Sequence, residues 1–172
     1  MLQHRWTLTL AFLLALPAAS TAQTSATESG HASATVEQIP ITLLQSGEMN
    51  FGTFAPWGLA GFVTVHPLAS TATTGSNVTI SGQGFPARFT VTGTPHLPFT
   101  VVWPADRSVS VNNGSGNVMV IEYFFSSYHE NGTSPVLNAS GAASFTVGAK
   151  LLVNPNQHPG VYTGSFPLTV AY

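Results

Sequence analysis

Apolar and small polar side chains alternate along much of this chain, and the pattern is clearest in residues 159–172. Phe166, Leu168, Val170 and Tyr172 are apolar or aromatic, and the residues between them are Pro, Thr and Ala. Successive side chains of a β-strand point to opposite faces, so a period of two separates a buried face from an outer one. The pattern predicts a final strand over residues 166–172 with a structural role.

Similar alternation, or a short apolar run, recurs roughly every ten residues between Gly, Pro and Asn turn signals, and no helical period stands out. Residues 118–125 form the most apolar run after the N-terminal region, and they predict a central strand covered on both faces. Gly148 is interpreted as a break between two strands. The sequence therefore predicts an all-β, antiparallel β-sandwich of about nine short strands over residues 39–172. The other predicted strands cover residues 39–43, 62–65, 78–80, 89–91, 99–103, 143–147 and 149–153, and residues 49–54 and 109–111 also alternate.

The N-terminal residues have the three parts of a secretory signal peptide. Arg5 supplies a positive charge, residues 8–16 are apolar, and residues 20–22 form a small-x-small cleavage site. We predict a signal peptide over residues 1–22, hence export to the periplasm, the cell surface or the medium. We predict a flexible segment over residues 23–38 and no membrane span once the signal is removed.

Charge and cysteine content narrow the classes of partner. Only 6% of the residues are charged and the formal net charge is −2. Because no basic patch is present, a nucleic-acid partner is not expected. The chain has no cysteine, so neither disulfides nor thiolate chemistry enter the prediction.

The sequence shows no recognisable catalytic, cofactor or metal-binding motif. Asp106 is the single Asp, Glu122 is interpreted as the polar face of a strand, and Asp106 and Glu130 as solvated turns. The His residues occur singly, without the local pair expected of a metal site. We therefore predict no catalytic, cofactor or metal residues, and no enzyme.

Several segments together resemble a known family. They comprise an Asn-Phe-Gly-Thr-Phe opening at residues 50–54 and the strand patterns at residues 63–65, 87–93, 144–151 and 160–172. In order and spacing they resemble the bacterial exported family called domain of unknown function 4402. The opening and the Gly-x-Tyr-x-Gly motif at residues 160–164 also resemble, more distantly, spore coat protein U and chaperone–usher pilin-like domains, although those relatives often carry cysteines. The resemblance implies an immunoglobulin-like or pilin-like sandwich and supplies no catalytic residues.

Three functional hypotheses follow. In the first, the protein is a pilin-like or coat subunit, whose partners are copies of itself or a periplasmic chaperone. The assembly strand is Phe166, Leu168, Val170 and Tyr172, and the donor strand is Ala32, Ala34 and Val36. Ile39, Ile41 and Leu43 are more apolar and would be better donors, unless they form the first strand of the domain itself. In the second, it is a monomeric exported binding or adhesion module, with Trp57, Trp103 or Tyr128 contacting a ligand. In the third, it is an eight-stranded outer-membrane barrel, which the short predicted strands disfavour.

Overall fold

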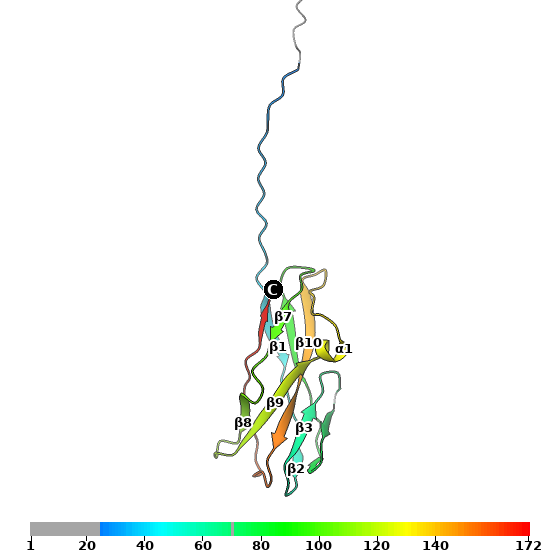
Figure 1. The fold of residues 1–172 in the computed structure, drawn as a ribbon, viewed down its shortest axis with the longest axis vertical. Helices are drawn as coiled ribbons and strands as arrows, with labels where there is room; N and C mark the ends of the chain where they lie inside the picture. Colours follow the sequence, from blue (N-terminus) through cyan, green and yellow to red (C-terminus); the bar gives the residue numbers. More distant parts are fainter. Residues whose placement is uncertain (1–24, 70) are drawn as a thin grey trace, which may run out of the picture. The chain divides into compact units, whose positions relative to one another are not determined.

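Antiparallel strands are the main regular structure of the described chain, as the computed structural model in Figure 1 shows. The structure describes residues 25–69 and 71–172, so the predicted signal peptide lies outside the described residues. In the described residues there are eleven strands and one short helix. They are β1 (Thr42–Gly47), β2 (Phe54–Pro56), β3 (Gly61–Val65), β4 (Ala72–Thr74), β5 (Val78–Ile80), β6 (Ala87–Thr92), β7 (Thr100–Val102), β8 (Val109–Asn112), β9 (Val118–Ser126), α1 (Ser127–Asn131), β10 (Ala142–Val153) and β11 (Thr169–Ala171).

The chain divides into two units at Val36 and Glu37. In the first unit, residues 25–36 are exposed and belong to neither a helix nor a strand. The proposed donor residues Ala32, Ala34 and Val36 therefore take part in no ladder within this chain, and their role stays a prediction.

The second unit is built around β10, the longest strand. Residues 142–147 pair with β6 and residues 149–153 pair with β3. Val147 of β10 pairs with Ala87 of β6 and also with Ser126 of β9. β6 and β9 therefore lie along opposite edges of β10. The large sheet runs β1-β6-β10-β3-β4, and β9 joins β10 to β8.

Gly148 does not break the chain into two strands, contrary to the sequence-based interpretation. It lies inside β10 and pairs with Phe125. A Cβ atom at this position would collide with the carbonyl oxygen of Val65 and would lie 2.7 Å from Cδ of Pro67. Glycine is needed here because a neighbouring backbone passes close to the strand. From the sequence alone, a glycine at such a position is easily interpreted as the end of a strand.

Two small sheets complete the unit: β11 pairs with β7, and β2 pairs with β5. The final strand is shorter than predicted, since only Thr169–Ala171 is assigned to β11. The predicted alternation nevertheless appears in the burial pattern, because Phe166, Leu168 and Val170 are half-buried and the residues between them are exposed.

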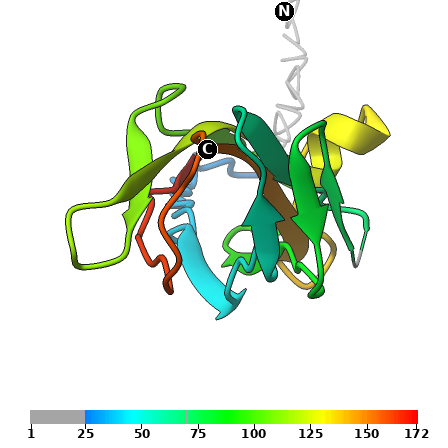
Figure 2. The same ribbon diagram turned by 90° about the horizontal axis from the view of Figure 1, so that it is seen from below.

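The interior holds two adjoining groups of buried side chains. One is centred on Val63, Met119 and Leu151, and the other on Val91, Leu137 and Phe145. Phe124 and Phe166 pack against both groups, which joins them into a continuous core. Figure 2 shows the sheets curving around this interior.

β9 does not have two covered faces as the sequence predicted. It is flanked by β8 and β10, but Val118 and Tyr123 are exposed while Met119 and Ile121 are buried. At its end the unpredicted helix α1 begins, with Ser126 as N-cap accepting from the His129 N–H at 3.3 Å. The helix spans five residues, too few to display a sequence period.

The predicted all-β, antiparallel class is confirmed. The finer description as an immunoglobulin-like or pilin-like sandwich remains a prediction. In the described part of the chain, no helix has both the length and the apolar character required to cross a membrane.

Candidate functional site

The β7–β11 sheet exposes two strand edges, because each strand has only the other as its ladder partner among the described residues. Near β11, Leu168 and Val170 pack against the same buried group as Ile41 and Leu43, which lie just before and within β1. No ladder joins β1 to β11 in the described chain. The outer edge of β11 is therefore an unpaired edge beside half-buried apolar side chains.

Tyr172 fixes the end of this strand through its hydroxyl group. The hydroxyl donates to the carbonyl oxygen of Ile39 at 2.8 Å and accepts a hydrogen bond from the Thr94 N–H. The Ile39 N–H in turn donates to the side chain of Thr94 at 2.8 Å. Of the predicted assembly strand, Tyr172 thus contacts the start of the domain, while the other three residues face the core.

A second feature is a hollow between β7, β9 and α1. It consists of two adjoining parts of about 440 and 320 Å³, which share Trp103, Ser126 and His129. We call it the aromatic groove. The first part is also lined by Tyr123, Phe124 and Phe125, and the second by Phe99, Val101, Tyr128, Thr133 and Pro135.

The groove lies between β7 and β9, which form no ladder with each other in the described chain. β9 pairs with β8 as far as Ile121, and β7 pairs with β11. The N–H of Phe99 points away from β11 and donates to the carbonyl oxygen of Pro135 on the groove side. Backbone groups two residues apart in a strand point the same way, so the N–H and C=O of Val101 also face the groove. The groove therefore offers the backbone edge of β7 as well as aromatic side chains.

Aromatic packing holds the groove lining in place. Tyr128 meets Phe99 edge-on at 6.1 Å and Phe145 at 5.7 Å between ring centroids, and Tyr123 lies 5.8 Å from Phe125. Burial raises the pKa of the Tyr128 hydroxyl above its ordinary value, so this group stays a neutral hydrogen-bonding group at physiological pH. Such centroid separations are those of favourable aromatic pairs.

A cluster of three charges lies beside Tyr123. The carboxylate of Glu122 binds Lys150 at 2.8 Å and Arg107 at 2.6 Å, and the Lys150 ammonium lies 4.2 Å from the ring centroid of Phe62. Hydrogen bonding to Lys150, and then to Arg107, lowers the pKa of Glu122. Glu122 is the polar position of β9, as predicted, and it fastens the connection between β7 and β8 to the large sheet.

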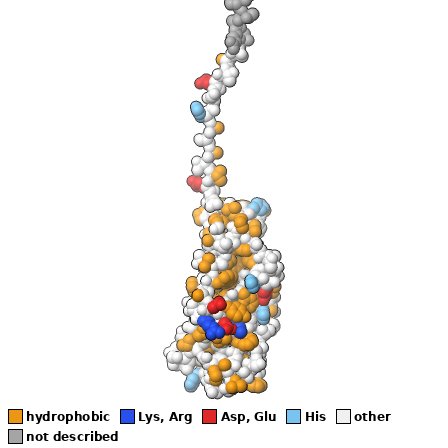
Figure 3. Space-filling view, viewed as in Figure 1, with side chains coloured by type: hydrophobic (Ala, Val, Ile, Leu, Met, Phe, Trp, Pro, Cys, Tyr) orange, Lys and Arg blue, Asp and Glu red, His pale blue; other side chains and the backbone are white. Residues whose placement is uncertain are grey.

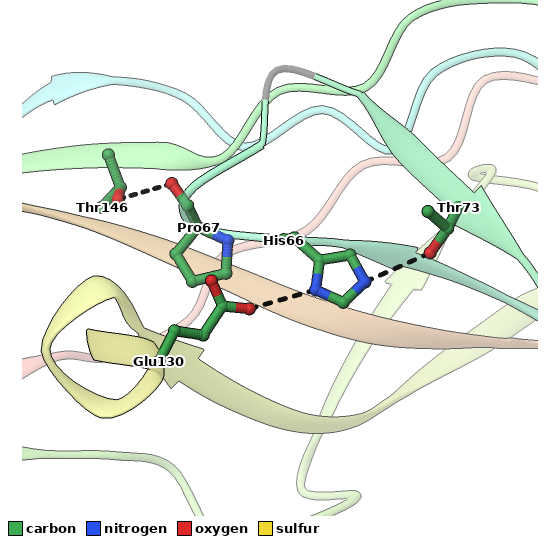
Figure 4. Close-up of polar contacts among 5 residues, drawn as sticks. All are labelled: His66, Pro67, Thr73, Glu130 and Thr146. Carbon is green, nitrogen blue, oxygen red and sulfur yellow. Dashed lines mark hydrogen bonds and ion pairs between the residues drawn. The ribbon is translucent and has the colours of Figure 1, made fainter. Parts of the chain in front are cut away.

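His66 links three segments on the other side of β9, as Figure 4 shows. Its Nδ1 lies 3.1 Å from a carboxylate oxygen of Glu130 in α1, and its Nε2 lies 3.2 Å from the hydroxyl of Thr73 in β4. The ring also packs edge-on against Phe125 at 5.7 Å. Glu130 is therefore paired rather than simply solvated, a contact that the sequence hides because the partners are 64 positions apart.

Glu130, His66 and Thr73 present a carboxylate, an imidazole and a hydroxyl in the order of a nucleophilic triad. However, neither His66 nor Thr73 lines either part of the aromatic groove, where a substrate could bind. A triad also requires a place for the reacting group beside the nucleophile. We therefore assign the contact to the tethering of α1 and β4. Within the described residues no three His, Cys, Asp or Glu side chains converge as metal ligands.

The structure brings together two of the three aromatic residues that the sequence selected as ligand contacts. Trp103 and Tyr128 line the aromatic groove, whereas Trp57 lies elsewhere and donates its indole N–H to Thr79 at 3.0 Å. Tyr123, Phe125 and His129 were missed, since apolar side chains of a strand and a lone His are ordinary core or surface residues in a sequence.

These features define an all-β protein of antiparallel strands with an aromatic groove on its surface. Comparison with protein families places the chain more specifically: it belongs to the family described as Domain of unknown function (DUF4402), whose profile matches residues 41–172. This confirms the family that the sequence resembles; the distant resemblance to spore coat and pilin-like proteins stays a prediction. Searches of curated proteins and of solved structures found no match.

Proposed function

We propose that this protein is an exported, non-enzymatic structural or surface subunit that assembles by strand addition. The observation that carries the proposal is the unpaired outer edge of β11, beside the half-buried side chains of Leu168 and Val170. An extended segment placed on this edge gains backbone hydrogen bonds and covers apolar side chains. Export rests on the signal-peptide pattern of residues 1–22.

The proposed donor is the N-terminal segment of a second copy. Its alternating residues Ala32, Ala34 and Val36 are fully available, since Val36 is 92% exposed. Burying one valine and two alanine methyl groups contributes about 3–5 kcal/mol. Association costs about 4–15 kcal/mol, so the side chains do not suffice and the backbone ladder must supply the remainder. We therefore expect assembly that depends on protein concentration, or on a chaperone.

The test compares the oligomeric state of the exported protein with and without residues 23–38, by light scattering over a range of concentrations. We expect the deletion to abolish assembly. Val36→Asp should weaken it, whereas the matched control Thr35→Asp, which adds the same charge on the alternate face, should have a smaller effect. Assembly that is unchanged by the deletion would refute donation by this segment.

A second candidate function, a monomeric binding module, is favoured by the aromatic groove. Trp103 and Tyr128 lie together in this open hollow, and aromatic side chains with a few polar groups are typical of binding sites. A stable monomer at all concentrations, with a single cooperative unfolding transition, would favour this function over strand addition.

A further inference from the structure

We propose that the aromatic groove binds a neutral saccharide. The inference rests on the second candidate function, the binding module, and names the class of its ligand. It is independent of whether the protein assembles by strand addition at β11.

The ends of the groove limit the length of its ligand. Phe99 to Trp103 covers five residues, or about 13 Å at ~3.3 Å per residue. At one end the Phe99 N–H donates to Pro135 at 3.1 Å, and at the other the Arg107 N–H donates to Glu122 at 3.0 Å. These hydrogen bonds tie the chain to its neighbours on either side of this stretch, and one or two sugar rings fit the span between them.

The lining has the two kinds of surface that a sugar ring requires. Trp103, Tyr123 and Tyr128 present aromatic rings, against which the C–H face of a pyranose packs. The indole N–H of Trp103 and the hydroxyl of Tyr128 make no hydrogen bond within the described part of the chain, and neither is a buried unsatisfied group, so both are accessible to a ligand. With the β7 edge at Val101, they supply donors and acceptors for sugar hydroxyls.

The charges around the groove favour a neutral ligand. Among the described residues that line it, none is Lys, Arg, Asp or Glu. The nearby carboxylate of Glu122 already binds Lys150 and Arg107, so neither it nor Lys150 is free to pair with a charged ligand. Figure 3 shows this face, with apolar side chains gathered in its middle and the charged cluster below them. Apart from the His129 imidazole, the lining therefore offers a charged ligand no counterion to replace its lost water.

The test is a fluorescence titration of the exported protein carrying Trp57→Phe, which leaves Trp103 as the tryptophan outside the predicted signal peptide. The probes are maltose, cellobiose and N,N′-diacetylchitobiose, with glycerol as the solvent control. We expect a saturable change for at least one disaccharide, with a Kd of about 1 mM because sugar–protein hydrogen bonds replace sugar–water ones. By calorimetry, Trp57→Phe should bind like the unmodified protein.

Two further variants separate binding from folding. Tyr128→Phe keeps the ring and removes the hydroxyl, so it should weaken binding about fivefold, the effect of one hydrogen bond. Trp103→Ala should abolish binding; if it unfolds the protein, Trp103→Phe replaces it and should weaken binding by a similar factor. Unchanged affinity in Tyr128→Phe and Trp103→Phe together would overturn the assignment of the groove.

The other outcomes are equally definite. If no disaccharide binds but an alternating Val-Thr hexapeptide binds in saturable fashion, the saccharide is wrong and the binding module stands. If neither binds, both the saccharide and the binding module are overturned. Stronger binding of an anionic disaccharide, such as one containing glucuronate, than of the neutral ones would also overturn the proposal.

Discussion

Replacing Gly148 with alanine tests the packing that organises the large sheet. Gly148 lies where the pairing of β10 passes from β6 to β3, between Val147, which pairs with Ala87, and Ala149, which pairs with Val65. Beside it the chain leaves β3, and the carbonyl oxygen of Pro67 accepts from the Thr146 hydroxyl at 2.7 Å. The backbone near Pro67 is thus held against β10 and has little freedom to move.

The magnitude follows from what the new methyl group would meet. Its Cβ would collide with the Val65 carbonyl oxygen and lie 2.7 Å from Cδ and 2.9 Å from N of Pro67. These are backbone and ring atoms, so relief requires the two strands to separate. Overpacking a core costs about 1–3 kcal/mol, and we expect the upper half of that range, about 2–3 kcal/mol.

The assay is urea unfolding, supported by the thermal midpoint. A loss of 2–3 kcal/mol lowers the midpoint by roughly 4–12 °C for a chain of this size. Gly58→Ala is the matched control, because a Cβ at Gly58 meets nothing within 4 Å, and it should stay within about 0.5 kcal/mol of the unmodified protein. If the free energy of unfolding of Gly148→Ala equals that of Gly58→Ala, the inferred close approach of the backbone at the end of β3 to β10 is wrong.

Three further predictions concern single contacts. Tyr172→Phe should lower the free energy of unfolding by about 1–2 kcal/mol in urea titration, because Ile39 and Thr94 each lose a hydrogen bond; no change would mean that the C-terminal contact does not form. Leu137→Ala should cost about 2–5 kcal/mol, since Leu137 is 1% exposed in the core, and calorimetry showing less than 1 kcal/mol would contradict its burial. The lowered pKa of Glu122 means that its ion pairs stabilise the protein above pH ~4.3 and that this contribution disappears as the pH falls through the lowered folded-state pKa. Glu122→Gln should therefore be less stable at neutral pH and lose less stability on acidification, and identical acid titrations of the two proteins would be evidence against the cluster.

The aromatic groove was only partly predictable. Trp103 and Tyr128 were selected because exposed aromatic residues bind ligands, and the structure places both in the groove. Their meeting depends on the pairing of β7 with β11 and of β9 with β8 and β10, a choice between partners that alternation along one strand does not encode. The contact of His66 with Glu130 was hidden for the same reason, because it joins the end of β3 to α1.

Local patterns along the chain are enough to predict the secondary-structure class and the family. Side-chain alternation is a local property, so the all-β class and the inward positions of Phe166, Leu168 and Val170 follow from neighbouring residues alone. Other features depend on contacts between segments that are distant in the sequence. The tertiary structure made one strand of residues 142–153, because the glycine within it makes room for another strand's backbone. It also created the groove and the charge cluster of Glu122, since both consist of contacts between segments that only the folded chain brings together.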